Sequence, residues 1–152
     1  MRFIVIKVLI ALYFVAFSIC VKNMSSDECV FCKRYDLVHQ AELSFISQDK
    51  YPASPGHMLI VPNRHVPNYF DCTQEEVTEL WQMVKHAKQL VEIDHQPDSY
   101  NIGINVSKAA GQSVPHTHIH LIPRYLGDVE DPRGGVRSVI PTKRTYTRTP
   151  RK

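Results

Sequence analysis

Three histidines at alternate positions near the carboxyl end constrain the fold of this chain more than any other feature. They are His116, His118 and His120 in the segment PHTHIHLIPR. On a β-strand successive side chains point to opposite faces, so the three imidazoles would share one face. The residues of the other face are Thr117, Ile119 and Leu121. Each buried imidazole needs partners for its ring nitrogens, so strict alternation is hard to explain as packing and indicates a strand beside a cleft or a metal.

The segments around this one predict further strands. Ala41–Pro62 contains two short β-rich runs on either side of the connection DKYPASPGH. Runs joined by a segment rich in Pro and Gly predict neighbouring antiparallel strands. Tyr100–Val106 alternates and predicts another strand. With 43% hydrophobic and 22% charged residues in 152, the chain suits one globular domain with a sizeable core.

A capped amphipathic helix is expected between these strands. Thr73 and Glu76 form the capping box T-x-x-E. The apolar stripe that follows contains Val77, Leu80, Trp81, Val84 and Val91. This spacing predicts that Trp81 packs in the core, and His95 and Pro97 mark the end of the helix. Helix and strands together predict an α+β fold.

Residues 1–23 are expected to contribute nothing to this fold. Arg2 and Lys7 precede an apolar run of 14 residues, Val8–Val21, which suits the core of a signal peptide better than a membrane span. A marginal membrane anchor is a second interpretation. The third, which we favour, is a non-native start, because Met24 begins MSSDECVFCK, which is typical of a cytosolic amino terminus.

The domain is expected to cover residues 24–141, followed by a basic tail at 142–152. From Arg124 to the end the chain has eight Lys and Arg residues against three acidic ones. Such a segment can attract phosphates or nucleic acid, but a solvated end is the simpler interpretation. Nucleic acid is therefore not the expected partner.

The four cysteines do not form a disulfide scaffold in a chain of this size. Cys29 and Cys32 form C-x-x-C, which suits one tetrahedral zinc if two further ligands come from elsewhere. A redox dithiol is the alternative, but the strand and helix of a thioredoxin-like motif do not surround this pair.

Gly111, Gln112 and Ser113 stand just before the histidines. They supply a flexible backbone, an amide and a hydroxyl, which are groups able to hold a phosphate without a full charge. A short loop of this composition is also typical of a simple turn.

The segment GQSVPHTHIHLIPR closely resembles the signature of the histidine triad (HIT) family of nucleotidyl hydrolases and transferases, although Thr117 is less apolar than usual at its position. The resemblance extends from Cys29 to Pro141, because CVFC, DKYPASPGH, IVPNRHV and the capped helix occur in the family's order. The ending DPRGGVRSVIP is similar to that of bacterial members of the diadenosine tetraphosphate hydrolase type. The tryptophan-bearing end of the phosphoramidase branch is absent.

This resemblance implies a compact α+β fold with an antiparallel sheet of about five strands, packed helices and a homodimer. It also implies that the middle histidine, His118, attacks the α-phosphorus of a nucleotide and carries a nucleotidyl intermediate, which water then releases. A neutral imidazole is abundant at physiological pH, and covalent catalysis splits one hard displacement into two easier ones. A carbonyl oxygen, or the imidazole of His120, would hold the other ring proton, and Ser113 would steady the phosphoryl oxygens.

Substrate contacts follow from the same resemblance. Asp49 matches the family acid that binds the ribose hydroxyls, and Asn105 matches an asparagine near the phosphates. His57 occupies the place where the family brings a further histidine near the active site. Gly111, Gln112 and Ser113 would contact the phosphates. Each of these residues also has a structural interpretation: a turn for Asp49, a strand end for Asn105 and a packing role for His57.

The resemblance also supplies partners for the predicted metal. In members with C-x-x-C, the zinc site resembles a Cys2His2 site. The matching residues here are Cys29, Cys32, His65 and His116. His116 would then be a ligand, so protonation of the leaving group would fall to Ser113, a water or the phosphate itself. The zinc would be structural and closed. Thiolates favour a reducing compartment, so we expect a cytoplasmic protein, with export or anchoring through residues 1–23 as the alternative.

The expected function is hydrolysis of a dinucleoside polyphosphate, such as diadenosine tetraphosphate, to release a nucleoside monophosphate. Within the same family the alternatives are a purine nucleoside phosphoramidase and a dinucleoside polyphosphate phosphorylase. A nucleotide-binding signalling protein with slow turnover is a third. From another class, C-x-x-C and the basic tail favour a zinc-dependent nucleic-acid-binding module, whose binding would depend strongly on salt.

Overall fold

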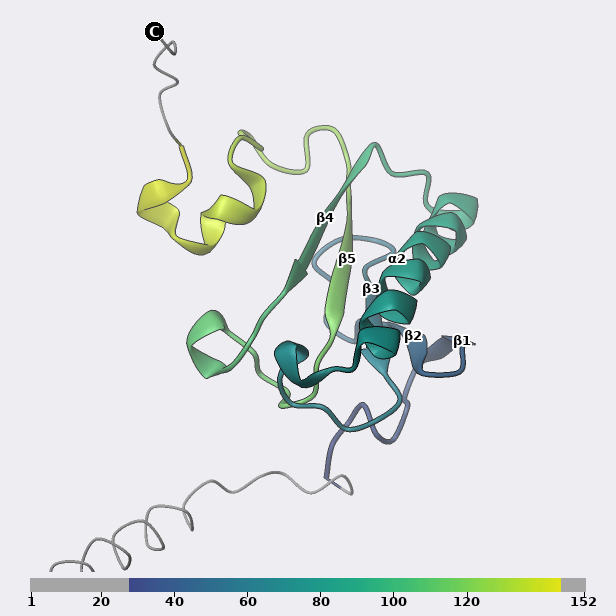
Figure 1. Ribbon diagram of the computed structural model, residues 1–152. Helices are drawn as coiled ribbons and strands as arrows, with labels where there is room; N and C mark the ends of the chain where they lie inside the picture. Colours follow the sequence, from purple (N-terminus) through teal and green to yellow (C-terminus); the bar gives the residue numbers. More distant parts are fainter. Residues whose placement is uncertain (1–27, 146–152) are drawn as a thin grey trace, which may run out of the picture.

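The fold is built on one five-stranded antiparallel sheet, seen in a computed structural model that describes residues 28–145 (Figure 1). The strands are β1 (Leu37–Gln40), β2 (Ser44–Gln48), β3 (Met58–Pro62), β4 (Ser99–Ile104) and β5 (Ile119–Arg124). They lie in the order β1-β2-β3-β5-β4. The antiparallel pair predicted around DKYPASPGH is β2 and β3, whereas β1 was not predicted.

The predicted segments at the two ends lie mostly beyond this part of the chain. The leader expected at residues 1–23 is outside the described residues, and so is the tail after residue 145. Between β5 and residue 145, where the sequence predicted loop, the chain forms the short 3-10 helices η3 (Gly135–Val139) and η4 (Pro141–Lys143). No helix within residues 28–145 has the length and apolar character needed to cross a membrane.

One long helix, α2 (Gln74–Asp94), covers one face of the sheet and is the only α-helix of residues 28–145 (Figure 1). The predicted capping box is confirmed: the Thr73 side chain accepts from the Glu76 N–H, and the Glu76 carboxylate accepts from the Thr73 N–H at 2.8 Å. The helix ends at its C-cap, His95, as expected. Its apolar side packs on β2, β3 and β5.

The buried stripe of α2 differs from the predicted one. Its members are Glu76, Leu80, Met83, Val84, Ala87 and Val91. Trp81, predicted in the core, is 41% exposed, and its Nε1 donates to the Tyr69 hydroxyl at 3.2 Å. That prediction was wrong because consecutive helical residues lie about 100° apart, so the stripe through Leu80 directs Trp81 to the side.

The two faces of the sheet carry different clusters. Towards α2, the core contains Ile46, Met58, Ile60, Ile119 and Leu121 together with the buried residues of the helix. On the opposite face lies a smaller apolar cluster of Phe45, Leu59 and Val61, with Phe31 packed against it. Leu59 pairs with His120 across β3 and β5, so the side chain of His120 points to this second face. The predicted site therefore lies opposite the helix.

The loop between β2 and β3 is held tightly against the end of α2. Gly56 has φ +79°, and a Cβ at this position would lie 2.7 Å from Cδ2 of His95. Only glycine combines this backbone conformation with this close approach. The Ser54 hydroxyl donates to the Pro123 carbonyl and ties the same loop to β5. These contacts place Asp49 and His57 beside the histidine segment.

Candidate functional site

The histidine segment runs along the sheet but is only partly a strand. Strand β5 begins at Ile119, so His120 lies in it, whereas His118 precedes the strand and His116 lies at a bend. This segment is tied to its neighbour by a bond from the Thr117 N–H to the Val66 carbonyl at 2.6 Å. The residues predicted for the opposite face are buried, as expected: Thr117, Ile119 and Leu121.

Among the described residues, only one ring nitrogen of His118 has a hydrogen-bond partner. Its Nδ1 lies 2.8 Å from the backbone carbonyl of His116. Since a carbonyl only accepts, Nδ1 carries the proton and Nε2 keeps its lone pair. Burial lowers the pKa of His118, outweighing the opposing effects of that carbonyl and of Asp49, so the ring is neutral near pH 7. The sequence predicted a neutral imidazole aimed by a carbonyl or by His120, and here the carbonyl holds the proton.

His57 and His120 form a hydrogen bond in which the donor and the acceptor can be assigned. The Ala53 N–H donates to His57 Nδ1 at 3.1 Å, so the ring proton of neutral His57 is on Nε2. That nitrogen lies 3.0 Å from His120 Nδ1, which must then accept, leaving the proton of His120 on Nε2. Burial, reinforced by His118 and His57, lowers the pKa of His120 to about 4. His120 is thus a neutral donor whose ring centre lies 4.9 Å from that of His118.

Asp49 joins this group from the β2–β3 loop. Its Oδ2 lies 3.4 Å from His57 Nδ1 and 4.0 Å from His120 Nδ1. Its Oδ1 accepts from the Tyr51 N–H at 2.8 Å, which orients the carboxylate. The structure therefore brings two predicted site residues of the β2–β3 loop and one of β5 into one cluster.

The loop before the histidines is ordered by the side chain of Gln112. Its Oε1 accepts from the Ser107 N–H at 2.7 Å, and its Nε2 donates to the Pro67 carbonyl at 2.8 Å. Gly111 adopts the left-handed conformation with φ +89°. Ser113 is exposed in this loop, whereas Asn105 is half-buried one residue beyond β4. The amide of Gln112, predicted to contact substrate, is occupied by these two backbone contacts.

The four predicted metal ligands meet at one point. The ligand atoms of Cys29, Cys32, His65 and His116 all lie within 4.8 Å of one another. His116 Nδ1 is 3.4 Å from the sulfur of Cys29 and 3.7 Å from that of Cys32, while His65 Nδ1 is 3.3 Å from the Cys32 sulfur. His116 Nε2 lies 2.9 Å from the Pro62 carbonyl and donates to it, so Nδ1 directs its lone pair at the cysteines.

This geometry fits a tetrahedral zinc ion. With Zn–S near 2.3 Å and Zn–N near 2.05 Å, neighbouring sulfur and nitrogen ligands stand about 3.6 Å apart. The observed separations of 3.3, 3.4 and 3.7 Å surround that value. Cys29 and His116 are fully buried, as expected for a closed structural site, and burial lowers the pKa of His116 to about 4. The described residues can therefore hold a metal without rearrangement.

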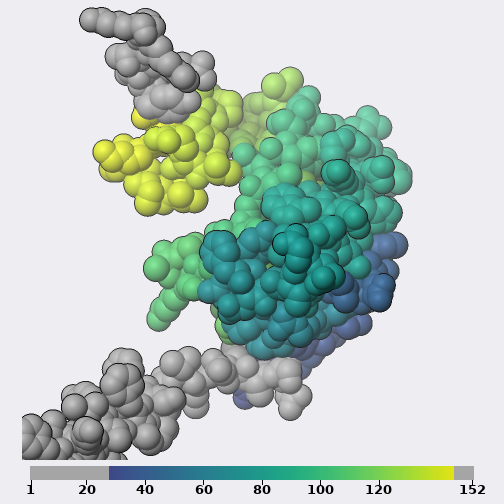
Figure 2. All heavy atoms as spheres, viewed as in Figure 1, coloured from purple at the N-terminus to yellow at the C-terminus, as the bar shows by residue number. Residues whose placement is uncertain are grey.

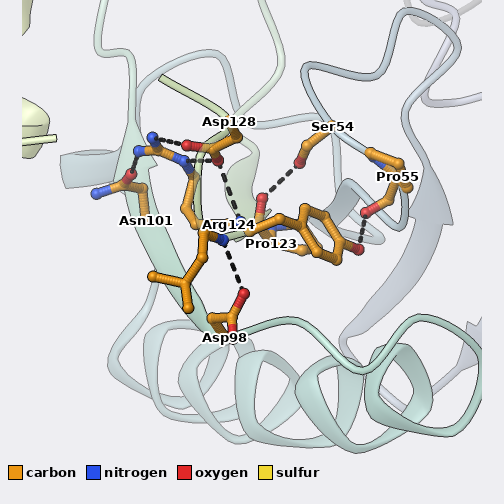
Figure 3. A network of polar contacts seen from close by, with 9 residues as sticks. Ser54, Pro55, Asp98, Asn101, Pro123, Arg124 and Asp128 are labelled. Atoms are coloured by element: carbon orange, nitrogen blue, oxygen red, sulfur yellow. Dashed lines mark hydrogen bonds and ion pairs between the residues drawn. The ribbon is translucent and has the colours of Figure 1, made fainter. Parts of the chain in front are cut away.

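Arg124, the fixed cation nearest the histidines in sequence, is committed elsewhere. Its guanidinium makes two bonds to the Asp128 carboxylate, at 2.6 and 2.7 Å, and a third to the Asn101 side chain (Figure 3). Asp128 also accepts from the Tyr125 N–H. This network stabilises the turn after β5, and the sequence did not reveal the direction of Arg124.

Sequence reasoning missed Phe31 as a site residue. Its ring centre lies 5.0 Å from that of His118 and 5.9 Å from that of His116. Its position inside C-x-x-C could have indicated this role, because a residue between two metal ligands must lie close to the metal site. Phe31 thus places an aromatic ring beside the ring of His118.

Comparison with known proteins identifies the family of this chain. The HIT domain family profile matches residues 33–127. A bis(5'-adenosyl)-triphosphatase of Dictyostelium discoideum is 38% identical over 99 residues, covering 65% of this chain and 66% of the relative. An asymmetrical bis(5'-nucleosyl)-tetraphosphatase of Schizosaccharomyces pombe is 38% identical over 93 residues, or 61% and 51% of the two chains. The match thus spans about half to two thirds of these relatives.

A solved structure shares the fold and bears on the metal. The zinc-bound histidine triad protein of Mycobacterium smegmatis superposes with a TM-score of 0.64 at 29% identity, covering 70% of this chain and 82% of its own. This likeness confirms the predicted α+β HIT fold. The bound zinc is a property of that protein.

Proposed function

This chain belongs to the histidine triad family, and from that premise we propose that it is a nucleotidyl hydrolase that cleaves dinucleoside polyphosphates, such as diadenosine tetraphosphate, at an α-phosphate. The observation that carries the proposal is the state of His118. Its Nδ1 proton is held by the His116 carbonyl at 2.8 Å, its ring is neutral, and its Nε2 lone pair is free. These are the requirements of an imidazole nucleophile.

The reaction proceeds in two balanced displacements. His118 Nε2 forms a bond to the α-phosphorus while the bond from that phosphorus to the bridging oxygen breaks, and the electron pair leaves with a nucleoside polyphosphate. Water then attacks the phosphorus, the P–N bond breaks, and the nucleoside monophosphate departs. The water gives up its proton to solvent, and the neutral ring of His118 is restored.

His120 and Ser113 assist at the phosphorus. The Nε2–H of His120 is directed by the chain from Ala53 through His57, so it donates to a phosphoryl or bridging oxygen as charge develops there. Ser113 supplies a neutral donor on the loop side, whereas the Gly111 N–H is engaged by the Lys108 carbonyl. These roles are consistent with zinc ligation by His116, which excludes that residue from acid catalysis.

The nucleoside is held on the other side of His118. Asp49, with one oxygen bound to the Tyr51 N–H, directs the other oxygen at the ribose hydroxyls. Phe31 offers a ring face to the base. Asn105, half-buried beyond β4, is assigned to the phosphates.

We further propose that Cys29, Cys32, His65 and His116 hold one zinc ion. The ion would be structural, cross-linking the amino-terminal segment to the histidine segment. Because the carbonyl that orients His118 belongs to His116, a fixed His116 also keeps the nucleophile in place. The thiolate ligands favour a reducing compartment, so we place the protein in the cytoplasm.

A homodimer is the assembly that the open edge of the sheet favours. Strand β4 pairs with β5 on one side only among the described strands, and Ile102 in it is exposed. Figure 2 shows the carboxyl-terminal segment and the loop that carries η2 (Lys108–Ala110) projecting on the same side, with an open recess between them. A second copy of β4 would cover this edge and hide its free backbone groups.

The test is trapping of the intermediate. The protein, with zinc bound, is mixed with diadenosine tetraphosphate, and samples quenched in alkaline denaturant, in which a P–N bond to histidine is stable, are analysed by mass spectrometry. We expect an adenylyl group on His118, with AMP and ATP as products, and loss of both in His118→Gly. When inorganic phosphate is added, the product should still be AMP and not ADP. This result distinguishes hydrolysis from phosphorolysis. Label on another residue, or turnover that survives the substitution, would refute the mechanism.

A further inference from the structure

An open hollow of about 600 Å³ lies beside the loop that precedes the histidines. Ser113 and Gln112 line it on one side and Asn68 lines it on another, while Lys108 supplies the single cation. None of the lining residues is acidic. A hollow with one cation, several neutral donors and no carboxylate is suited to an anion.

The backbone around Lys108 is held by hydrogen bonds within its own loop. The Ala110 N–H donates to the Ser107 carbonyl at 3.1 Å, and the Gly111 N–H donates to the Lys108 carbonyl at 3.0 Å. Gln112 then ties the loop to Pro67. Ser107 has φ +67°, which is uncommon for a residue other than glycine and is maintained only by surrounding contacts. The loop therefore presents Lys108 in a defined position rather than on a loose turn.

Within the described part of the chain, Lys108 has no acidic partner, a state it shares with Lys85 but not with the paired basic residues of the domain. Arg64 is paired with Glu76, Lys88 with Glu92 and Arg124 with Asp128. Within residues 28–145, no ion pair is found for Lys108. Its charge is available to a ligand in the hollow.

We propose that this hollow is the subsite for the leaving polyphosphate and that Lys108 binds its phosphates. The inference rests on the proposed function, which places the α-phosphate between His118 and Ser113. Ser113 lines the hollow, so phosphates beyond the scissile bond enter it and meet the ammonium group of Lys108. Lys108 is thus a specificity residue that favours leaving groups with several phosphates over uncharged ones.

The experiment compares two substrates of the full-length protein. We measure kcat/KM for diadenosine tetraphosphate and for adenosine 5'-phosphoramidate, whose leaving group carries no phosphate. Lys108→Ala should lower the ratio of the two values about tenfold, mainly through KM for the tetraphosphate, in line with the loss of one phosphate contact. Lys108→Arg should retain most of the ratio, and the effect should shrink as salt is raised.

Lys85→Ala is the matched control, because Lys85 is an exposed lysine on α2 away from the hollow. Thermal unfolding of each variant checks that the fold is intact. A ratio for Lys108→Ala within twofold of the unsubstituted protein would overturn the subsite and leave the proposed function standing. Absence of turnover and of His118 labelling with both substrates in the unsubstituted protein would overturn both.

Discussion

Glu76 is the residue whose replacement most directly tests how the helix and the zinc-ligand loop are joined. Its side chain is only 6% exposed and accepts three hydrogen bonds. Two come from the Arg64 guanidinium, at 3.0 and 2.8 Å, and one from the Thr73 N–H at 2.8 Å. Arg64 directly precedes His65 in sequence, so this contact links the start of α2 to a predicted metal ligand.

Glu76→Ala should lower the free energy of unfolding by about 2–3 kcal/mol. Half of the capping box and a favourable charge at the helix amino end together contribute about 1 kcal/mol. The ion pair with Arg64 adds about 1–2 kcal/mol rather than more, because the Arg64 side chain is 53% exposed and is rehydrated when its partner is lost. For a chain of this size the melting temperature should fall by about 5–10 °C.

The assay is urea unfolding at pH 7, with Glu75→Ala as the matched control because Glu75 is an exposed acid of the same turn. The Arg64 bonds lower the pKa of Glu76. Its stabilising contribution is therefore complete above its ordinary pKa of 4.5 and disappears as the pH falls through the lower folded value. Equal losses for Glu76→Ala and Glu75→Ala, or a difference that does not shrink as the pH is lowered below 4.5, would refute this reasoning.

Three further outcomes are expected. Cys29→Ala should reduce bound zinc from about one ion per chain to almost none by elemental mass spectrometry, whereas Cys72→Ala, outside the cluster, should retain it. Because burial lowers the pKa of His118, single-turnover adenylylation should hold its rate as the pH drops through 6.5 and decline only below it; a decline centred at or above 6.5 would contradict a neutral buried nucleophile. Ile102→Lys on the β4 edge should convert a dimer to a monomer in sedimentation velocity, and an unchanged sedimentation coefficient would refute that interface.

The class of the fold could be predicted from the sequence alone, whereas the chemistry of the site stays a prediction. Alternation of the histidines predicted that their side chains would share one face, and the rings of His118 and His120 lie 4.9 Å apart. The capping box of Thr73 and Glu76 is equally local, since its partners lie three residues apart. The roles assigned to the individual histidines came from the family resemblance, and their catalytic test is still to be made.

Tertiary structure decided which partner each group meets. Trp81 lies outside the core because the sheet packs against the neighbouring stripe of α2. Arg124 pairs with Asp128 and does not contact the histidines. The proton positions on His57 and His120 depend on the Ala53 N–H, contributed by a separate loop. Such contacts join residues distant along the chain, and spacing within a segment carries no information about what packs against it.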